Sequence, residues 1–258
     1  MKIVTLVENT SINENLKSEH GHSLYIETEK HRILFDMGQT ELFAENAKKL
    51  GIDLEGVDIA IVSHGHYDHG GGLKKFLEIN SKAPIYISKY AFEPHYNGTE
   101  KYIGLDRVLM NSERIVYTDK KTRIADGLTL YSCNDKKKTY ELGSFGLNKK
   151  LGADFLPDDF LHEQYLCVEE NGKKVLISGC SHKGILNIVE WFEPDVLVGG
   201  FHFSKLPLDE TLVNYAKTLN QYDTDYYTCH CTGEEQYCFM KKHMDTLSYL
   251  STGEILAL

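Results

Sequence analysis

The sequence lacks the features of a membrane-spanning or modular protein. It contains no run of about eighteen apolar residues, the length that a membrane-crossing helix needs. With five prolines in 258 residues, it also has no low-complexity segment and no Pro/Gly/Ser-rich linker. No basic stretch followed by an apolar core and a small-residue cleavage site precedes the first strand pattern. These absences exclude the membrane as a partner and predict one cytoplasmic domain over residues 1–258.

Basic residues are outnumbered by acidic ones. The chain has 28 Lys and Arg against 38 Asp and Glu, for a formal net charge of −10. Because a phosphate backbone is bound through a basic face, this balance excludes nucleic acid as the main partner. A local basic pocket for a small anion is compatible with it, so we expect a small-molecule substrate that can be anionic. The oligomeric state is left open, with a homodimer as one alternative.

The sequence also lacks a disulfide framework, which a chain of this length does not need. Its six cysteines do not form a dense framework, and an apolar content of 41% supplies a core without one. The pair Cys229 and Cys231 has no second pair beside it in the sequence, so it does not make a four-ligand zinc site. We expect the thiols to be reduced, as in the cytoplasm.

Apolar periodicity and turn signals predict a chain of short strands and helices. Strands are predicted at 2–8, 23–28, 32–36, 57–62, 84–88, 108–117, 128–131, 163–168, 174–178, 195–199, 226–229, 247–251 and 255–258. Helices are predicted at 41–50, 72–80, 185–192 and 210–219, and from 234 onwards.

One stretch concentrates metal-binding chemistry. After an apolar strand pattern, residues 63–69 read Ser-His-Gly-His-Tyr-Asp-His, and three glycines follow. Imidazole and carboxylate groups are ligands that zinc, manganese and iron accept. A loop that leaves a strand spreads its side chains, so His64 and His66 can serve one ion while Asp68 and His69 serve another. The glycines allow sharp turns before the next helix pattern begins.

This histidine-rich loop resembles the signature loop of the metallo-β-lactamase superfamily. The resemblance implies a divalent metal, with zinc favoured and manganese or iron as alternatives, and one or two ions per chain. It also implies that a late histidine, here His230, completes the shell of the ion held by Asp68 and His69. The Asp-x-Gly at Asp36 resembles a family motif whose aspartate holds a ligand histidine from behind. On composition alone, Asp36 could equally form a strand-end turn.

The order of elements is that of a mixed α/β (α+β) fold of the metallo-β-lactamase type. This is a four-layer αββα sandwich, in which two sheets pack face to face with helices outside and the site lies along one edge. Between residues 89 and 160 the pattern loosens, and compact family members have less chain there. We interpret this stretch as an insertion that covers the site and shapes substrate choice.

Two corners in the second half repeat the order of strand, polar residues and helix. His182, in Gly-Cys-Ser-His, is predicted to be the third ligand of the ion held by the first two loop histidines. Cys180 stands where many family members have a bridging aspartate. A thiolate can bind metal there, and a small buried cysteine is an equal alternative. Lys183 is a candidate for binding an anionic group of the substrate.

Two further histidines have weaker sequence signals. His202, at a strand end after paired glycines, is a candidate general acid or anion-binding group, with a structural hydrogen bond as the alternative. His20 lies between the first two predicted strands, where a loop histidine is usually solvated. The alternative is that His20 approaches the site from this neighbouring loop and binds substrate.

The motifs around 179–184, 199–202 and 230–233 resemble the branch that includes a dihydropterin–ribofuranosylaminobenzene-phosphate synthase and predicted metal-dependent hydrolases. We predict metal-assisted hydrolysis of a small phosphoester, lactone or cyclic amide, with Asp68 orienting the nucleophile. One alternative is a transferase related to that synthase. Others are a di-iron redox protein and a non-catalytic metal- or ligand-binding protein. Redox relatives usually carry a glutamate where His66 stands and an attached flavin domain, and this chain has neither.

Overall fold

The computed structural model describes residues 1–258 and divides the chain into two compact units. Unit 1 comprises Met1–Asp119, Ser144–Glu163 and Ser251–Leu258, and unit 2 comprises Lys120–Gly143 and Gln164–Leu250. The longest helix, α5 (Glu210–Leu219), has 10 residues, whereas a membrane-crossing helix needs about 20. No helix therefore has the length and apolar character to cross a membrane.

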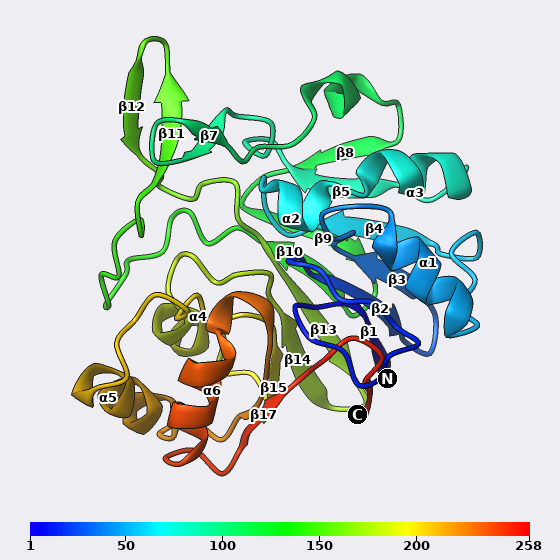
Figure 1. Cartoon of the computed structure of the whole chain (residues 1–258). Coiled ribbons are helices and arrows are strands. Elements are labelled where there is room, and N and C mark those ends of the chain that lie inside the picture. Colours follow the sequence, from blue (N-terminus) through cyan, green and yellow to red (C-terminus); the bar gives the residue numbers. More distant parts are fainter. The chain divides into compact units, whose positions relative to one another are not determined.

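Unit 1 is built on a seven-stranded mixed sheet (Figure 1). In sheet order its strands are β18 (Ile255–Ala257), β1 (Lys2–Val7), β2 (Ser23–Glu27), β3 (Arg32–Phe35), β4 (Ile59–Val62), β5 (Ile85–Ser88) and β8 (Ile115–Thr118). The pairs from β18 to β3 are antiparallel, and those from β3 to β8 are parallel. Parallel neighbours need a crossover connection. Helices α1 (Leu42–Lys49) and α3 (Leu73–Ile79) provide two of them.

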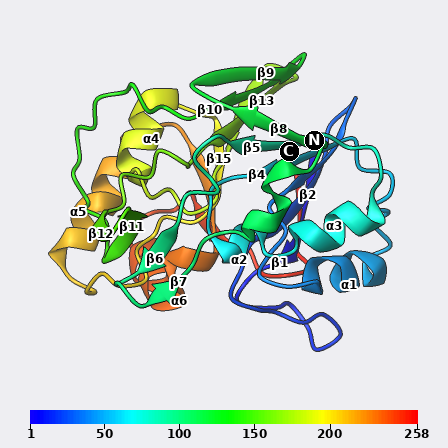
Figure 2. The ribbon, with the colours of Figure 1, turned by 90° about the horizontal axis from the view of Figure 1, so that it is seen from above.

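Helices α1 and α3 lie beside the large sheet of unit 1 (Figure 1 and Figure 2), and their apolar side chains pack into a common core with it. Phe43 and Ala47, four residues apart, lie on the buried side of α1, and Leu73 and Phe76 lie on that of α3. These side chains share one hydrophobic core with Val62, the last residue of β4. Because burying a side chain of this kind stabilises a fold by about 1.5–3 kcal/mol, the core fixes the strand end at which the histidine-rich loop begins.

A second, four-stranded sheet of unit 1 comes from the stretch with the loosest sequence pattern (Figure 1). Its order is β12 (Asp154–Pro157), β11 (Leu147–Leu151), β6 (His95–Asn97) and β7 (Lys101–Tyr102). These strands were not predicted, because they are short and their residues are mostly exposed or half-exposed, so no clear alternation of apolar and polar residues marks them. The strand predicted at 108–117 is wrong in its first half. Arg107–Asn111 is a 3₁₀ helix, capped by Asp106, and β8 begins only afterwards.

Unit 2 is built on the other seven-stranded sheet. In sheet order its strands are β17 (Leu247–Tyr249), β16 (Asp225–Thr228), β15 (Val196–Val198), β14 (Lys173–Ile177), β13 (Tyr165–Glu170), β10 (Leu128–Tyr131) and β9 (Lys121–Ala125). The pairs from β14 to β17 are parallel. The helices α4 (Ile185–Phe192), α5 and α6 (Glu234–Lys241) lie between these strands along the chain and pack into a common core with them.

The two large sheets with crossover helices confirm the mixed α/β class. The helix predicted at 210–219 has the bounds of α5, whose first turn is capped by Asp209 accepting from the N–H of Thr211 at 2.8 Å. Residues 120–143 of the predicted insertion belong to unit 2, and the rest of 89–160 belongs to unit 1. The single-domain organisation and the insertion stay predictions.

One buried amide supports the approach of the chain to β4, and its removal should weaken the fold. Nδ2 of Asn80, which carries two N–H groups, lies 2.9–3.2 Å from three backbone carbonyls, those of Leu54, Glu55 and Val57. We expect Asn80→Ala to lower the free energy of unfolding by roughly 2–3 kcal/mol, because buried carbonyls lose their donor. Urea denaturation measures the change. The exposed neighbour Lys82 is the control, and an equal effect of Lys82→Ala would contradict the assignment.

Candidate metal centre

The four predicted ligands of the histidine-rich loop lie together in unit 1. β4 leads into the loop, and a four-residue helix, α2 (Tyr67–Gly70), carries its second half. The ring centroid of His64 lies 4.6 Å from that of His66 and 4.0 Å from that of His69. All three rings are buried, and Asp68 keeps only 8% of its surface exposed.

A fully buried carboxylate, that of Asp36, stands behind the loop. Its Oδ2 accepts from Nδ1 of His69 at 2.7 Å and from Nδ1 of His22 at 3.1 Å. Ser63 donates its backbone N–H to Oδ1 and its hydroxyl to Oδ2, each at 2.7 Å. The backbone of Asp36 is left-handed, with φ of 60°, which is uncommon outside glycine. Asp36 therefore both turns the chain and contacts a loop histidine, whereas the contact of His22 was not predicted.

These contacts determine which nitrogen of each loop histidine carries a lone pair. A carboxylate only accepts, so the Ser63 hydroxyl gives its one proton to Asp36 and accepts Nδ1–H of His64 at 2.8 Å. His69 likewise donates its Nδ1–H to Asp36. In both neutral rings the lone pair is then on Nε2, which is the arrangement of metal-ligating histidines. The loop therefore fits a divalent ion.

The surroundings of Asp36 also set its charge. Burial alone raises the pKa of a carboxyl group, but His69 and His22 more than offset this effect and lower the pKa of Asp36 to about 2. Asp36 is therefore a carboxylate at neutral pH, and it can act only as an acceptor for the groups around it.

The glycines Gly71 and Gly72 form the turn between α2 and α3, as expected, and they also allow close packing. Gly71 and Gly72 have ordinary right-handed backbone, with φ of −62° and −76°. A Cβ at Gly71 would collide with the carbonyl of Gln39, and one at Gly72 with that of Met37. The N–H of Met37 also donates to the carbonyl of His69 at 2.7 Å. The chain after β3 thus lies directly against the loop.

His20 reaches the loop from the connection between β1 and β2. Its Nε2 lies 3.2 Å from Oδ2 of Asp68, although 58% of its side chain is exposed. The exposed side chain agrees with the interpretation of His20 as a solvated loop histidine. The contact with Asp68 agrees with the alternative, in which His20 approaches the histidine-rich loop. The binding of substrate by His20 stays a prediction.

Unit 2 brings two of the predicted histidines into contact. The ring centroids of His182 and His202 lie 4.5 Å apart. Ser181, His202 and His230 all have left-handed backbone, with φ of 58°, 58° and 48°. Such a conformation costs energy for residues other than glycine and recurs at functional sites. The backbone of unit 2 therefore turns sharply at the strand ends where the sequence predicted corners.

Two cysteines join this group in unit 2. The sulfur atoms of Cys180 and Cys231 and a ring nitrogen of His202 all lie within 4.8 Å of one another. Burial alone raises the pKa of a thiol, but contacts with Cys180 and His202 hold the pKa of Cys231 well below its usual value. Cys180 is buried and lies beside other possible metal ligands, so its position is compatible with both predicted alternatives, a metal ligand and a small buried residue. Cys231 was missed because its Cys-x-Cys spacing indicates only an incomplete zinc site.

Lys183 is held inside unit 2. Its Nζ donates to the carbonyl of Ser132 at 2.6 Å and to Oδ1 of Asn134 at 2.7 Å, and only 3% of the residue is exposed. The ammonium therefore ties the chain after β10 to the corner that precedes α4. The predicted contact of Lys183 with substrate stays a prediction.

The predicted ligands are thus shared between the two units. The four loop residues belong to unit 1, whereas His182 and His230 belong to unit 2. The assignment of His182 and His230 to particular ions stays a prediction.

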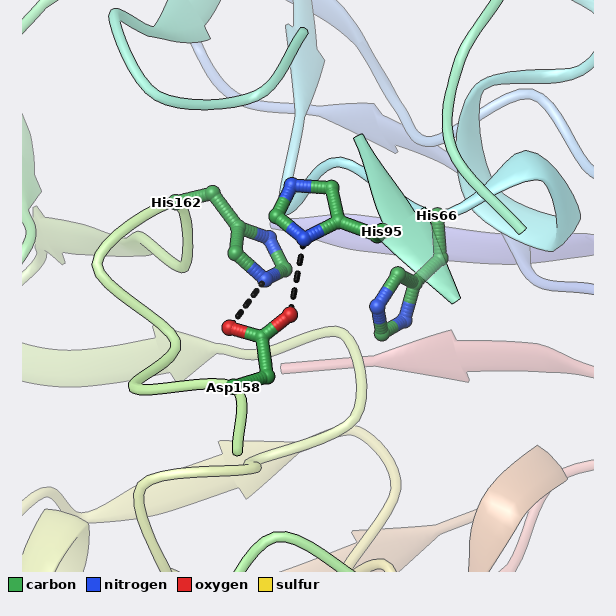
Figure 3. Close-up of side chains that lie close together, drawn as sticks. All are labelled: His66, His95, Asp158 and His162. Atoms are coloured by element: carbon green, nitrogen blue, oxygen red, sulfur yellow. Dashed lines mark hydrogen bonds and ion pairs between the residues drawn. The ribbon is translucent and has the colours of Figure 1, made fainter. Parts of the chain in front are cut away.

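A second polar cluster of unit 1 was missed by the sequence analysis (Figure 3). Ligating atoms of His66, His95, Asp158 and His162 all lie within 4.8 Å of one another, and all four residues are buried. His95 opens β6, and Asp158 and His162 follow β12. No strand-to-helix corner marks these three positions in the sequence, so no local signal separated them from ordinary polar residues.

Comparison with known proteins identifies the family of the chain. Residues 18–218 match the family described as the metallo-beta-lactamase superfamily. The chain belongs to the metallo-β-lactamase superfamily. This membership confirms the resemblance of the histidine-rich loop and the fold class that it implied.

Three known proteins are similar to most of the chain. The 7,8-dihydropterin-6-methyl-4-(beta-D-ribofuranosyl)-aminobenzene-5'-phosphate synthase of Methanocaldococcus jannaschii is 30% identical over 99% of this chain and 96% of that protein. An uncharacterized protein of the same organism, MJ0448, is 31% identical over 90% of both chains. The crystal structure of Tm1679, described as a metal-dependent hydrolase of the beta-lactamase superfamily, is 30% identical, with a TM-score of 0.85 over 100% of this chain and 99% of that one. These similarities confirm the predicted branch.

We expect Asp36→Asn to reduce the acid sensitivity of the metal-free protein. The pKa of Asp36 is about 2 in the folded state against an ordinary value of 3.8, so its stabilisation is complete above about pH 4 and is lost as the pH falls through 2. A shift of this size corresponds to about 2 kcal/mol. Urea unfolding between about pH 5 and pH 2 should show a smaller pH dependence in the variant.

Asp135→Asn, at an exposed loop position, is the control for Asp36→Asn. It should leave the pH dependence of unfolding as it is in the unsubstituted protein. An Asp36→Asn variant that behaves like this control would contradict the role of the buried carboxylate.

Proposed function

We propose that this protein is a metal-dependent hydrolase that activates water at a mono- or binuclear site. The observation that carries the proposal is the orientation of the loop histidines. His64 and His69 direct Nδ1 at Ser63 and Asp36, which leaves the Nε2 lone pairs for an ion. Histidines that are only solvated are not oriented in this way. The 30% identity to Tm1679, described as a metal-dependent hydrolase, supports the same class.

The donor set favours zinc, with manganese or iron as alternatives. A bound divalent ion would supply a Lewis acid and lower the pKa of a coordinated water to about 7. Cys180 either replaces a bridging carboxylate or leaves the site with one ion. The proposed ligands are His64, His66 and His182 for one ion and Asp68, His69 and His230 for a second.

The remaining residues of the proposal hold the nucleophile and the substrate. Asp68 would orient the attacking water as well as bind the ion, since its carboxylate is the least buried group among the four loop ligands. His20, 3.2 Å from this carboxylate, would contact the substrate. His202 would donate a proton to the leaving group or bind an anionic group, and Lys183 would help to hold such a group.

The proposed substrate is a small phosphoester, lactone or cyclic amide in the cytoplasm. With a formal charge of −10, the chain as a whole repels anions, so an anionic substrate would need local donors such as His20 and His202. We propose that the stretch 89–160, which contributes the four-stranded sheet of unit 1, selects among these substrates.

A second candidate function is that of a synthase. It is favoured by the 30% identity to the Methanocaldococcus jannaschii synthase, which extends over 99% of the chain. A synthase would join two substrates at the same ion, whereas a hydrolase would cleave one substrate with water. Because both reactions place a nucleophile beside the loop, the side chains alone do not separate them.

Metal content tests the centre directly. Protein purified without chelator or metal-binding tag should contain about one or two zinc, manganese or iron ions per chain by elemental analysis. His182→Ala should lower this number, because a proposed ligand is lost. His31→Ala, in a turn outside the proposed centre, is the control and should leave it unchanged. Protein that takes up no metal even on reconstitution would refute the proposal.

A substrate panel separates the two candidate functions. A hydrolase should cleave at least one member of a panel of phosphoesters, lactones and cyclic amides, and His66→Ala should slow that reaction by roughly a hundredfold or more, as for the loss of a strong electrostatic stabiliser. A synthase should leave the panel intact and join a dihydropterin to ribofuranosylaminobenzene phosphate. Product analysis by mass spectrometry decides between these outcomes.

A further inference from the structure

The backbone of the histidine-rich loop is held by a side chain from a distant part of unit 1. The N–H of Gly65, the residue between His64 and His66, donates to Nδ1 of His162 at 2.9 Å. His162 follows β12, 97 residues further along the chain. The amide between two proposed metal ligands therefore depends on a contact outside the loop.

Asp158 arranges His162 and His95 around itself (Figure 3). Its Oδ1 lies 3.4 Å from Nε2 of His162, and its Oδ2 lies 2.7 Å from Nδ1 of His95. The N–H of Phe160 also donates to Oδ1, at 2.8 Å. Burial alone raises the pKa of a carboxyl group, but the two histidines hold the pKa of Asp158 far below its usual range. Asp158 is thus a carboxylate that accepts hydrogen bonds from His95 and from the N–H of Phe160, while Nε2 of His162 faces it at 3.4 Å.

The bond to Gly65 determines where the proton of His162 lies. A nitrogen that accepts a hydrogen bond carries no hydrogen, so the neutral ring of His162 carries its proton on Nε2, facing Asp158. His95 directs Nδ1–H at Asp158, and its buried Nε2 has no hydrogen-bond partner. A second proton on His95 would therefore be unsatisfied. His95 therefore gives its Nδ1–H to the carboxylate in a hydrogen bond, whereas Nε2 of His162 faces the carboxylate at 3.4 Å.

These proton positions decide between a hydrogen-bonded cluster and an ion site. With a proton on Nε2, His162 has no lone pair to offer to an ion beside Asp158. The 2.7 Å between His95 and Asp158 is also the length of a charge-assisted hydrogen bond. Two ligands of a tetrahedral zinc, with bonds of about 2.0–2.1 Å, would lie roughly 3.3 Å apart. The distance between His95 and Asp158 is shorter than this, so at that pair the geometry favours a proton over an ion.

The loop has little room to move at Gly65. A Cβ on this residue would collide with the carbonyl of Ala91, so the backbone there is in close contact on a second side. The segment that carries His162 also packs on the loop through Phe160, which shares a small apolar cluster with Tyr67. Loss of the hydrogen bond to His162 would therefore make the Gly65 amide more mobile, while the packing around it keeps the loop folded.

We propose that His162 and Asp158 form a clamp that positions the loop backbone at Gly65 and thereby raises the affinity of His64 and His66 for their ion. The proposal rests on the metal site of the proposed function and adds the residues outside the loop that set its affinity. His95 holds Asp158 in place, and Asp158 holds His162. All three are positioning residues.

Two substitutions of His162 separate the clamp from general packing. Asn places an oxygen near the position of Nδ1, so His162→Asn keeps an acceptor for Gly65, whereas Gln reaches the position of Nε2, so His162→Gln loses it. In metal-free protein, NMR should detect hydrogen exchange of the Gly65 amide that is roughly tenfold faster in the Gln variant and little changed in the Asn variant. Thermal unfolding checks that both variants fold alike.

Zinc affinity, measured by competition with a chromophoric chelator, is the second readout. It should fall roughly 10–100-fold in His162→Gln and be largely retained in His162→Asn. Equal exchange of Gly65 in the two variants, or equal zinc affinity, would overturn the clamp.

Asp158→Asn tests the choice between protons and an ion. It should weaken zinc binding in the same direction as His162→Gln while the number of ions bound at saturation stays the same. Loss of an ion per chain would make the cluster a ligand set and overturn the proposal. If the unsubstituted protein binds no metal, the proposed function fails, whereas the Gly65 exchange in metal-free protein still decides whether His162 holds the loop.

Discussion

The buried carboxylate of Asp36 is the constraint on which the geometry of the histidine-rich loop depends. It accepts from His69 and His22 and from both the backbone and the hydroxyl of Ser63. A charge without contact with water is tolerated only while its oxygens accept hydrogen bonds. Rotation of His69 or withdrawal of Ser63 would leave this charge unsatisfied. That penalty, rather than any preference of the loop itself, orients the ligand rings before an ion binds.

Asp158 applies the same principle to the backbone of the loop. Asp36 fixes side chains, whereas Asp158 acts through His162 on the amide of Gly65. The two carboxylates come from different segments of unit 1, Met1–Asp119 and Ser144–Glu163, and two histidines lower the pKa of each. Ligands that are held in place in advance lose less conformational freedom when an ion binds, so such supports strengthen binding without touching the ion.

Sequence reasoning found what is local and missed what is not. His64, His66, Asp68 and His69 stand within six residues after an apolar strand, so spacing alone indicated their chemistry. The contacts of His162 with Gly65 span 97 residues, and no local pattern encodes such a separation. The short strands β6, β7, β11 and β12 were missed for a related reason: their stability comes from pairing with one another, and their own periodicity is weak.

The placement of the clamp limits how the stretch 89–160 can vary. This stretch provides the four-stranded sheet of unit 1, and Asp158 and Phe160 lie at its end, just before His162. Exposed strand residues such as Leu151 and Leu156 can change with little effect on the loop, because they are not part of the clamp. Asp158 cannot, and His162 can change only to a residue that keeps an acceptor for the N–H of Gly65, since other changes would leave a buried group unsatisfied. The proposed role of this stretch in substrate selection is therefore compatible with a fixed loop, because its exposed strands can diversify while Asp158 keeps its contacts.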